Sequence, residues 1–124
     1  MKIKLGKSEL IHFIGIGGIG MSGLALIMKE LGFKVQGSDI SINKNIERLK
    51  KNKIKVFEGH KVSNLNKTTV LVNSSAIKKN NSEIKYAKQK KIPIYSRGDM
   101  LAHIVSLMKN IVVVGSHGKT TTTS

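Results

Sequence analysis

Two clusters of glycine in this sequence have the spacing of loops that bind phosphate groups. The first, at residues 15–20, reads G-I-G-G-I-G and fits the pattern G-x-G-x-x-G. It follows an apolar segment and opens a segment of helical periodicity, which is the context that nucleotide-binding loops of this type have. Its glycines would permit a tight turn, close approach of a diphosphate to the backbone, and tight packing of the helix. The pattern predicts that this loop binds a dinucleotide or a nucleotide-sugar diphosphate.

A carboxylate, Asp39, ends the next predicted strand, where loops of this type place an acid that binds ribose. The plainer alternative is a glycine turn that only packs the helix, with Asp39 capping the helix that follows. No residue near the loop suggests a partner for hydride transfer, so a nicotinamide cofactor is the less favoured ligand. The motif alone does not choose between these ligands.

The second glycine cluster, at residues 115–120, reads G-S-H-G-K-T and follows the apolar run 111–114. It is shorter than the usual G-x-x-x-x-G-K-[ST] loop, because Val113 stands where the first glycine would be. Its parts would be backbone N–H groups for the phosphates, Lys119 for the β- and γ-phosphate oxygens, and Thr120 as a magnesium ligand. The sequence therefore predicts a nucleoside-triphosphate loop that starts from a strand at 111–114.

Strand-like and helix-like segments alternate along the chain and would position these loops. We predict strands at 9–14, 34–37, 55–57, 69–73, 92–95 and 111–114, and helices at 21–31, 45–51, 83–90 and 97–108, with at most a helical turn at 62–65. Ser82 is the expected cap of the third helix, and Pro93 favours an edge position or the start of the strand for the fifth strand.

Such alternation is typical of βαβ units with right-handed crossovers. We predict an α/β, Rossmann-like open parallel sheet with helices on both faces. One domain would span residues 1–109, and residues 110–124 would be the strand and phosphate loop that begin a second domain.

Composition narrows the function classes further. The chain of 124 residues has no cysteine, which excludes a disulfide framework, a thiolate zinc site and a cysteine nucleophile, and its four histidines lack metal-ligand spacing. Twenty-two basic against seven acidic residues give a net charge of +15, which raises nucleic-acid binding as an option. The lysines are spread over every polar segment and only two arginines occur, so a solvated basic surface is favoured.

No apolar run has the length of a membrane span or a signal peptide, so we expect a cytoplasmic location.

The two loops together resemble those of the Mur ligases of peptidoglycan synthesis. Further motifs match in the same order, and the resemblance covers essentially the whole chain; these motifs are Gly37-Ser38-Asp39, Gly59-His60, Asn73-Ser74-Ser75-Ala76-Ile77 and Ser96-Arg97-Gly98-Asp99-Met100-Leu101. One departure is Ser116, where the family usually has threonine.

The resemblance implies a three-domain, ATP-dependent amide-bond ligase. The first domain would bind the UDP part of UDP-N-acetylmuramate, the central domain ATP and Mg²⁺, and the last L-alanine. The muramate carboxylate would become an acyl phosphate, which the amine of alanine then attacks. We expect these 124 residues to be inactive by themselves. A murein tripeptide-recycling ligase and a nicotinamide-binding Rossmann domain remain the alternatives.

The resemblance also assigns binding residues. The UDP-sugar would contact Gly15, Gly17, Gly18, Ile19, Gly20 and Met21 with its diphosphate, Asp39 with its ribose, His60 with its uracil, and the rim residues Ser74, Ser75 and Ala76. ATP would contact Gly115, Ser116, His117, Gly118, Lys119, Thr120 and Thr121, with Thr120 also binding Mg²⁺. An ordinary loop histidine at position 60, and turn-capping serines at 74 and 75, are equally open. His12 and His103 are expected to be structural, and Arg97 to begin the last helix, from which it could reach toward the ligand.

Overall fold

The computed structural model describes residues 3, 5–41 and 43–115 of the chain. Its centre is a sheet of five parallel strands in the order β3-β2-β1-β4-β5. The strands are β1 (Leu10–Ile14), β2 (Lys34–Asp39), β3 (Lys55–Glu58), β4 (Val70–Asn73) and β5 (Ile94–Ser96). The helices are α1 (Ile19–Glu30), α2 (Lys44–Lys51), α3 (Ser82–Gln89) and α4 (Arg97–Gly115), with a 3-10 turn η1 (Val62–Leu65). The predicted α/β, Rossmann-like parallel sheet is confirmed.

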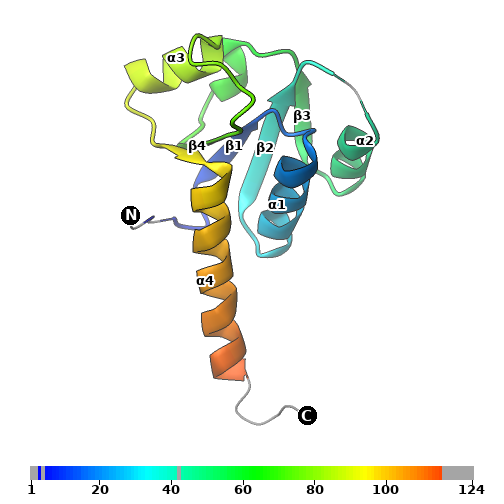
Figure 1. The fold of residues 1–124 in the computed structure, drawn as a ribbon, viewed down its shortest axis with the longest axis vertical. Coiled ribbons are helices and arrows are strands. Elements are labelled where there is room, and N and C mark those ends of the chain that lie inside the picture. The colour runs from blue at the N-terminus through cyan, green and yellow to red at the C-terminus, as the bar shows by residue number, and fades with distance from the viewer. Residues whose placement is uncertain (1–2, 4, 42, 116–124) are drawn as a thin grey trace.

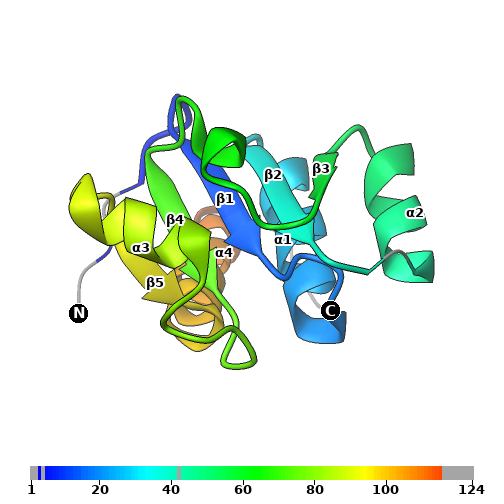
Figure 2. The same ribbon diagram turned by 90° about the horizontal axis from the view of Figure 1, so that it is seen from above.

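Helices cover both faces of the sheet. Successive side chains of each strand point to opposite faces, so apolar residues on both faces need a covering layer. In β1, Ile11 and Phe13 join the larger apolar cluster, which α1, α2 and α4 complete. Ile14 points to the other face and joins a smaller cluster beneath η1 and α3. Figures 1 and 2 show α3 on one side of the sheet and α1 and α4 on the other.

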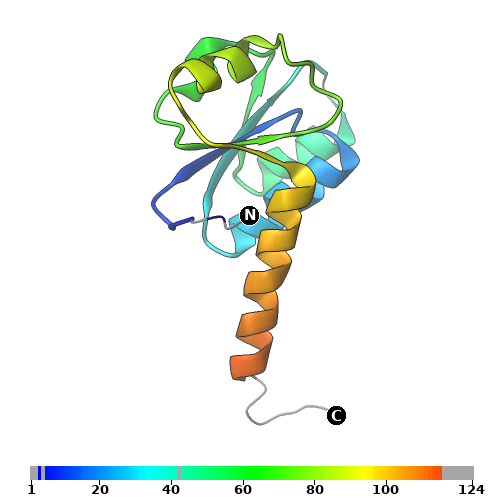
Figure 3. The same cartoon turned by 60° about the vertical axis from the view of Figure 1, so that its left-hand side comes forward.

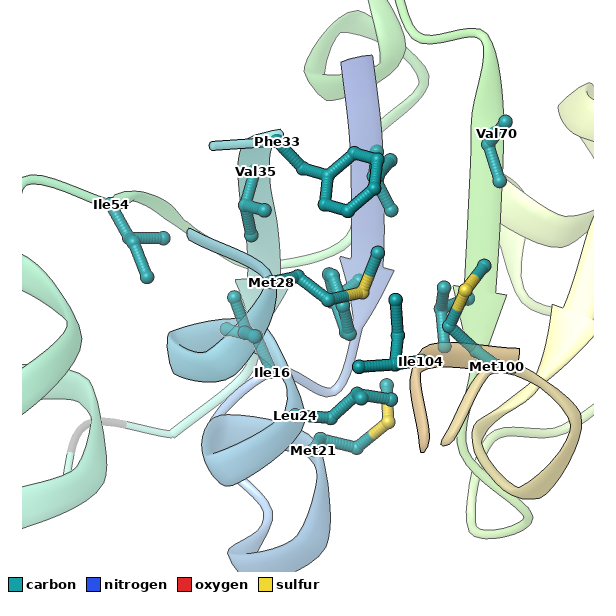
Figure 4. Close-up of a cluster of buried hydrophobic side chains, with 14 of the residues drawn as sticks. Ile16, Met21, Leu24, Met28, Phe33, Val35, Ile54, Val70, Met100 and Ile104 are labelled. Carbon is teal, nitrogen blue, oxygen red and sulfur yellow. The ribbon is translucent and has the colours of Figure 1, made fainter. Parts of the chain in front are cut away.

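The larger cluster fixes where α1 begins relative to the strands. Met21, Leu24 and Met28 recur at helical spacing on α1 and are all buried. They meet Met100 and Ile104 of α4 above the sheet (Figure 4). Since α1 is held along its length, the glycine loop before it is held at the end of β1.

Two glycines permit this close packing. Gly37, in β2, lies so near Ile16 that an added Cβ would be 2.5 Å from its Cδ1 atom and 2.7 Å from the carbonyl oxygen of Phe13. Gly15 has a positive φ of 78°, which L side chains rarely adopt. The path of the chain out of β1 therefore depends on glycine.

The end of α4 differs from the sequence-based prediction. We predict a helix at 97–108 followed by a strand at 111–114, but α4 continues to Gly115. Figures 1 and 3 show this helix running past the edge of the sheet. β-branched residues favour a strand only when a neighbouring strand pairs with them, and the described sheet is complete without 111–114. The prediction of a strand there is wrong for this structure.

Smaller differences concern the helix caps and the strand edges. The cap of α3 is Asn81, whose side-chain oxygen accepts a hydrogen bond from Glu83 N at 2.9 Å, and Ser82 is the first helical residue. The predicted position of Pro93 at an edge or strand start is confirmed, because Pro93 directly precedes β5, which lies at the end of the sheet and pairs only with β4.

Candidate functional site

The glycine loop is tied to the end of β2 by its own backbone. The N–H groups of Gly15 and Ile16 both donate to the carbonyl oxygen of Ser38, at 2.8 and 3.1 Å. Gly18 N then donates to Gly15 O at 3.1 Å, which closes the turn before α1. The loop thus lies at the carboxyl end of β1, where open parallel sheets bind their ligands.

Strand order makes this position distinctive. From β1 the chain leads to β2 and β3 on one side, whereas β4 and β5 lie on the other. The crevice between β1 and β4 is therefore the point where the strand order reverses, which is the usual ligand site of doubly wound sheets.

The N-terminus of α1 is open to an anion. Gly18 is its N-cap and makes no side-chain hydrogen bond, and the first turn contains no acidic residue. Gly18, Ile19 and Gly20 are exposed, whereas the side chain of Met21 is buried in the core. A contact of Met21 with a ligand would thus have to come from its backbone. Free N–H groups and the positive end of the helix dipole favour a phosphate here.

Asp39 lies against the glycine loop. Its Oδ2 atom accepts a hydrogen bond from Gly17 N at 2.8 Å, and its Oδ1 atom accepts from the backbone N–H and the hydroxyl of Ser41 at 3.1 and 3.2 Å. The side-chain amide of Asn45 donates to Gly17 O at 2.9 Å. Gly17 is thus held on both sides, and an added Cβ would lie 2.8 Å from Asp39 Oδ2. The carboxylate has lone pairs left for one more donor, such as a hydroxyl.

His60 follows β3 and contacts a buried polar cluster, which we call the Glu83 network and which comprises His12, Gln36, Ser38, His60, Asn64 and Glu83. Glu83 is fully buried and accepts hydrogen bonds from His12 Nε2 (2.9 Å), Ser38 Oγ (2.7 Å), Asn64 Nδ2 (2.8 Å) and the backbone N–H of Lys61 (3.1 Å). His12 is also fully buried, which supports its predicted structural role.

The Glu83 network determines which nitrogen of each histidine carries the proton. Gln36 Nε2 donates to Asn64 O at 2.8 Å, which identifies this atom as the amide nitrogen. The same nitrogen lies 2.9 Å from His12 Nδ1, so it also donates to Nδ1, which is the accepting nitrogen of His12. His12 donates from Nε2 to Glu83. Because the Ser38 hydroxyl proton points to Glu83, His60 Nδ1–H donates to Ser38 Oγ, at 2.8 Å.

Glu83 remains ionised because these donors outweigh its burial. Burial by itself raises the pKa of the Glu83 carboxyl. The hydrogen bond from His12 and the charge interaction with it, followed by the hydrogen bonds from Asn64 and Ser38, lower this pKa below its ordinary value. The carboxylate thus holds together β1, β2, the segment after β3 and the first turn of α3.

The third group of predicted residues follows β4. Ser74 closes a turn in which its hydroxyl accepts from Ala76 N at 3.1 Å and its carbonyl from Ile77 N at 3.1 Å. Ser74 and Ser75 line a pocket of about 260 Å³, whose other lining residues are Asn73, Ile94, Ser96, Arg97 and Gly98. Ala76 is exposed and lies outside this lining.

Two residues of this pocket were not assigned to the binding site from the sequence, although Arg97 was expected to be able to reach toward the ligand. Asn73 ends β4 opposite Ser96, and its Oδ1 atom is buried without a hydrogen-bond partner in the described part of the chain. Arg97 begins α4, and its side chain passes over Gly20, since an added Cβ there would be 3.1 Å from Arg97 Nε. The signals in the sequence were their places in the two motifs that resemble the Mur ligases, at the end of one predicted strand and just after another.

The predicted ATP residues lie almost entirely outside the described residues. Ser116, His117, Gly118, Lys119, Thr120 and Thr121 belong to the segment 116–124, and Gly115 is the last residue of α4. Within residues 3, 5–41 and 43–115, no cluster of three His, Cys, Asp or Glu side chains has the geometry of a metal site. In the same residues, no helix combines the length and apolar character needed to cross a bilayer.

The fold and its glycine loop define a Rossmann-like α/β domain. The family model described as "Mur ligase family, catalytic domain" matches residues 10–109. The chain therefore belongs to the Mur ligase family.

Individual relatives agree with this assignment. The UDP-N-acetylmuramate–L-alanine ligase of Pelagibacter ubique (strain HTCC1062) is 69% identical over 124 residues, which cover 100% of this chain and 27% of that protein. The crystal structure of the UDP-N-acetylmuramate–alanine ligase of Thermotoga maritima has a TM-score of 0.71 and 34% identity, over 81% of this chain and 23% of that one. A murein peptide ligase from Psychrobacter arcticus has a TM-score of 0.73 and 28% identity, over 77% and 20%. The chain thus spans about a quarter of the length of the relatives it matches.

Proposed function

We infer that residues 1–109 form the UDP-N-acetylmuramate-binding domain of an ATP-dependent ligase that joins L-alanine to this substrate in peptidoglycan biosynthesis. The observation that carries this proposal is the open N-terminus of α1 behind a glycine loop that Ser38 and Asp39 hold in place. The high identity to a ligase of that name supports the same reading over the whole chain.

The described residues would bind the parts of the nucleotide at the carboxyl ends of three neighbouring strands. The N–H groups of Ile19 and Gly20, beside the exposed backbone of Gly18, would bind the diphosphate. Asp39, one strand away, would accept a hydrogen bond from a ribose hydroxyl. His60, one strand further, would face the uracil with Nε2 as an acceptor, since Nδ1–H is engaged with Ser38. Uracil offers the N3–H donor that such an acceptor needs.

ATP and Mg²⁺ belong to the activity of the whole ligase. The G-K-T segment that begins at Gly115 would bind ATP, with Lys119 on the β- and γ-phosphates and Thr120 on Mg²⁺. ATP supplies the phosphoryl group that activates the muramate carboxylate before the amine of L-alanine attacks. We expect such an enzyme to work in the cytoplasm.

Calorimetric titration of the 124-residue chain tests the proposal. UDP-N-acetylmuramate is titrated beside UDP, NADH and a short DNA duplex at moderate salt. We expect saturable binding of UDP-N-acetylmuramate and of UDP, weakened by Asp39→Asn, and no saturable binding of the other two. Tight binding of NADH without binding of UDP would instead favour the nicotinamide alternative. Binding of DNA alone, with log affinity falling linearly in log salt, would favour the nucleic-acid alternative.

A further inference from the structure

Within the part of the chain that the structure describes, the protein engages one nitrogen of the His60 ring. The Nδ1 atom lies 2.8 Å from Ser38 Oγ, and no hydrogen bond from these residues reaches Nε2. The side chain is 12% exposed, so Nε2 is the nitrogen left for a ligand. A neutral histidine carries its proton on one nitrogen only, and the other nitrogen accepts. The group that fixes the tautomer of His60 therefore decides what this side chain can recognise.

That group is Glu83, which acts on His60 through Ser38. The single hydroxyl proton of Ser38 has two neighbours that could accept it, Glu83 Oε1 at 2.7 Å and His60 Nδ1 at 2.8 Å. A carboxylate is a stronger acceptor than a neutral ring nitrogen, so the proton goes to Glu83. Ser38 Oγ then presents only lone pairs to His60, and Nδ1 must carry a proton to form this hydrogen bond.

The carboxylate of Glu83 is fixed in the orientation that this choice requires. It is fully buried, and its other oxygen, Oε2, accepts from Asn64 Nδ2 at 2.8 Å and from Lys61 N at 3.1 Å. On the Oε1 side, His12 Nε2 donates at 2.9 Å. The carboxylate cannot turn away from Ser38 without leaving these buried donors unmatched, which is costly. The proton on Ser38 is thus held in one position.

Uracil and cytosine differ in the group that the free nitrogen of His60 would meet. The N3 atom of uracil carries a hydrogen and donates, whereas N3 of cytosine has no hydrogen and accepts. When Nε2 of His60 is an acceptor, it forms a hydrogen bond with uracil, but it would face N3 of cytosine lone pair to lone pair. Selection of the base therefore depends on which nitrogen of His60 is protonated.

On the basis of the proposed UDP-sugar function, we propose that Glu83 is a positioning residue that makes the site select uracil over cytosine, because it holds His60 in the Nδ1–H tautomer through Ser38. Glu83 does not contact the nucleotide. It acts from α3, on the side of the sheet opposite α1 and its glycine loop (Figure 2).

The experiment measures the affinities of the 124-residue chain and its variants for UDP and CDP by calorimetry. We expect the unaltered chain to prefer UDP about thirtyfold, because CDP leaves two acceptors facing each other. Glu83→Gln gives Ser38 a neutral acceptor or an amide donor and should reduce this preference about tenfold. Ser38→Ala removes the connecting hydroxyl and should have the same effect. Ile84→Val is the control, since it lowers stability at a buried neighbour of Glu83 and should leave the preference unchanged.

A spectroscopic measurement reports the tautomer itself. Long-range ¹H–¹⁵N spectra at about pH 8, where an ordinary histidine is neutral, should place the proton of His60 on Nδ1 in the unaltered chain and in Ile84→Val. In Ser38→Ala the proton should move to Nε2, and in Glu83→Gln both nitrogens should be partly protonated. A role of Glu83 in stability alone would leave the tautomer unchanged. Ser38→Ala and the spectrum of the unaltered chain keep the proposal testable if Glu83→Gln does not fold.

The possible failures of the two proposals differ. If the unaltered chain binds UDP and CDP equally, or carries the His60 proton on Nε2, the positioning role is overturned and the UDP site stands. The same holds if UDP is preferred and folded Glu83→Gln keeps both the preference and the tautomer. If the chain binds neither nucleotide, the proposed function is overturned, and this inference with it.

Discussion

At Glu83, one buried carboxylate accepts hydrogen bonds from three separate segments, β1, β2 and the segment after β3. Replacing it with glutamine puts an amide N–H₂ where two donors now converge, so a repulsive contact replaces a hydrogen bond. We expect Glu83→Gln to lower the free energy of unfolding by about 2 kcal/mol at pH 7. Chemical denaturation with urea measures this change. A stability equal to that of the unaltered chain would show that the hydrogen bonds to Glu83 contribute nothing net.

The same residue predicts a pH dependence. Since the pKa of Glu83 is lower in the folded chain than the ordinary 4.5, its stabilisation is complete above pH 4.5 and is lost as the pH falls through the lower, folded value. The unaltered chain should thus lose stability more steeply below pH 4.5 than Glu83→Gln does. Glu58→Gln, at an exposed carboxylate, should keep the steep dependence. Parallel curves for all three chains would contradict this assignment.

Gly17 allows a test of the loop geometry. Alanine at this position would place Cβ 2.8 Å from both Asp39 Oδ2 and Ile46 Cδ1, so the loop or α2 must shift. We expect Gly17→Ala to destabilise the chain by about 1–3 kcal/mol. Gly18→Ala is the control, because its Cβ would meet nothing closer than 3.5 Å and its φ of −65° suits alanine. Thermal melting of the two variants should separate them clearly; equal melting temperatures would contradict the packing at Gly17.

At the residue scale, the sequence predicted the functional residues that belong to one short motif, in which interacting residues are near each other in the chain. The spacing of Gly15, Gly17 and Gly20 located the loop, and the position of Asp39 after the second strand placed it beside Gly17. Glu83 could not be found in this way, since a glutamate in the first turn of a helix is ordinary. Its role depends on His12 and Asn64, which come from other elements.

Three lysines have backbone conformations that favour glycine. Lys53, Lys67 and Lys91 have φ values of 63°, 68° and 58°, and Lys91 follows the C-cap of α3. Lys91→Gly should therefore stabilise the chain by about 1 kcal/mol, since glycine adopts this region without strain. The same substitution inside α3, Lys88→Gly, should destabilise it by about 1 kcal/mol. Urea denaturation of both variants measures the change in the free energy of unfolding. A change of the same sign in both variants would contradict the prediction.

At the element scale, periodicity predicted most helices and strands because each buries a regular apolar face. Ile11 and Phe13 in β1, and Met21 and Leu24 in α1, are examples of this local pattern. The run 111–114 fails the same test, because four consecutive β-branched or apolar residues have no period. Its conformation depends on whether a strand lies beside it.

The charge of the whole molecule is unusually high for its size. With a net charge of +15, the folded chain holds many lysines closer together than the unfolded chain does, and their repulsion opposes folding. Raising NaCl from about 20 mM to about 200 mM screens this repulsion, so the melting temperature should rise by a few degrees. Lys78→Glu, at an exposed position, reduces the charge and should flatten this dependence. A melting temperature that falls with salt would contradict a dominant repulsion.

For the whole molecule, the sequence predicted a parallel sheet but not how its strands are ordered. The order β3-β2-β1-β4-β5 is determined by which faces of α1, α3 and α4 pack on the sheet. That order brings Asn73 and Arg97, distant from residues 15–20 in the chain, to the same side of the site as the glycine loop. The pocket they form is a product of tertiary packing and has no motif of its own.

The Glu83 network has a consequence for local motions. His12, Ser38, the segment 60–64 and α3 all share one carboxylate, so none can swing out without leaving a buried charge short of donors. Their amide protons should thus exchange with solvent in a single cooperative opening rather than segment by segment. A Rossmann-like half-sheet is usually expected to fray from its edge strand inward. Here the segment that follows the edge strand β3 would be protected nearly as well as the central strand β1.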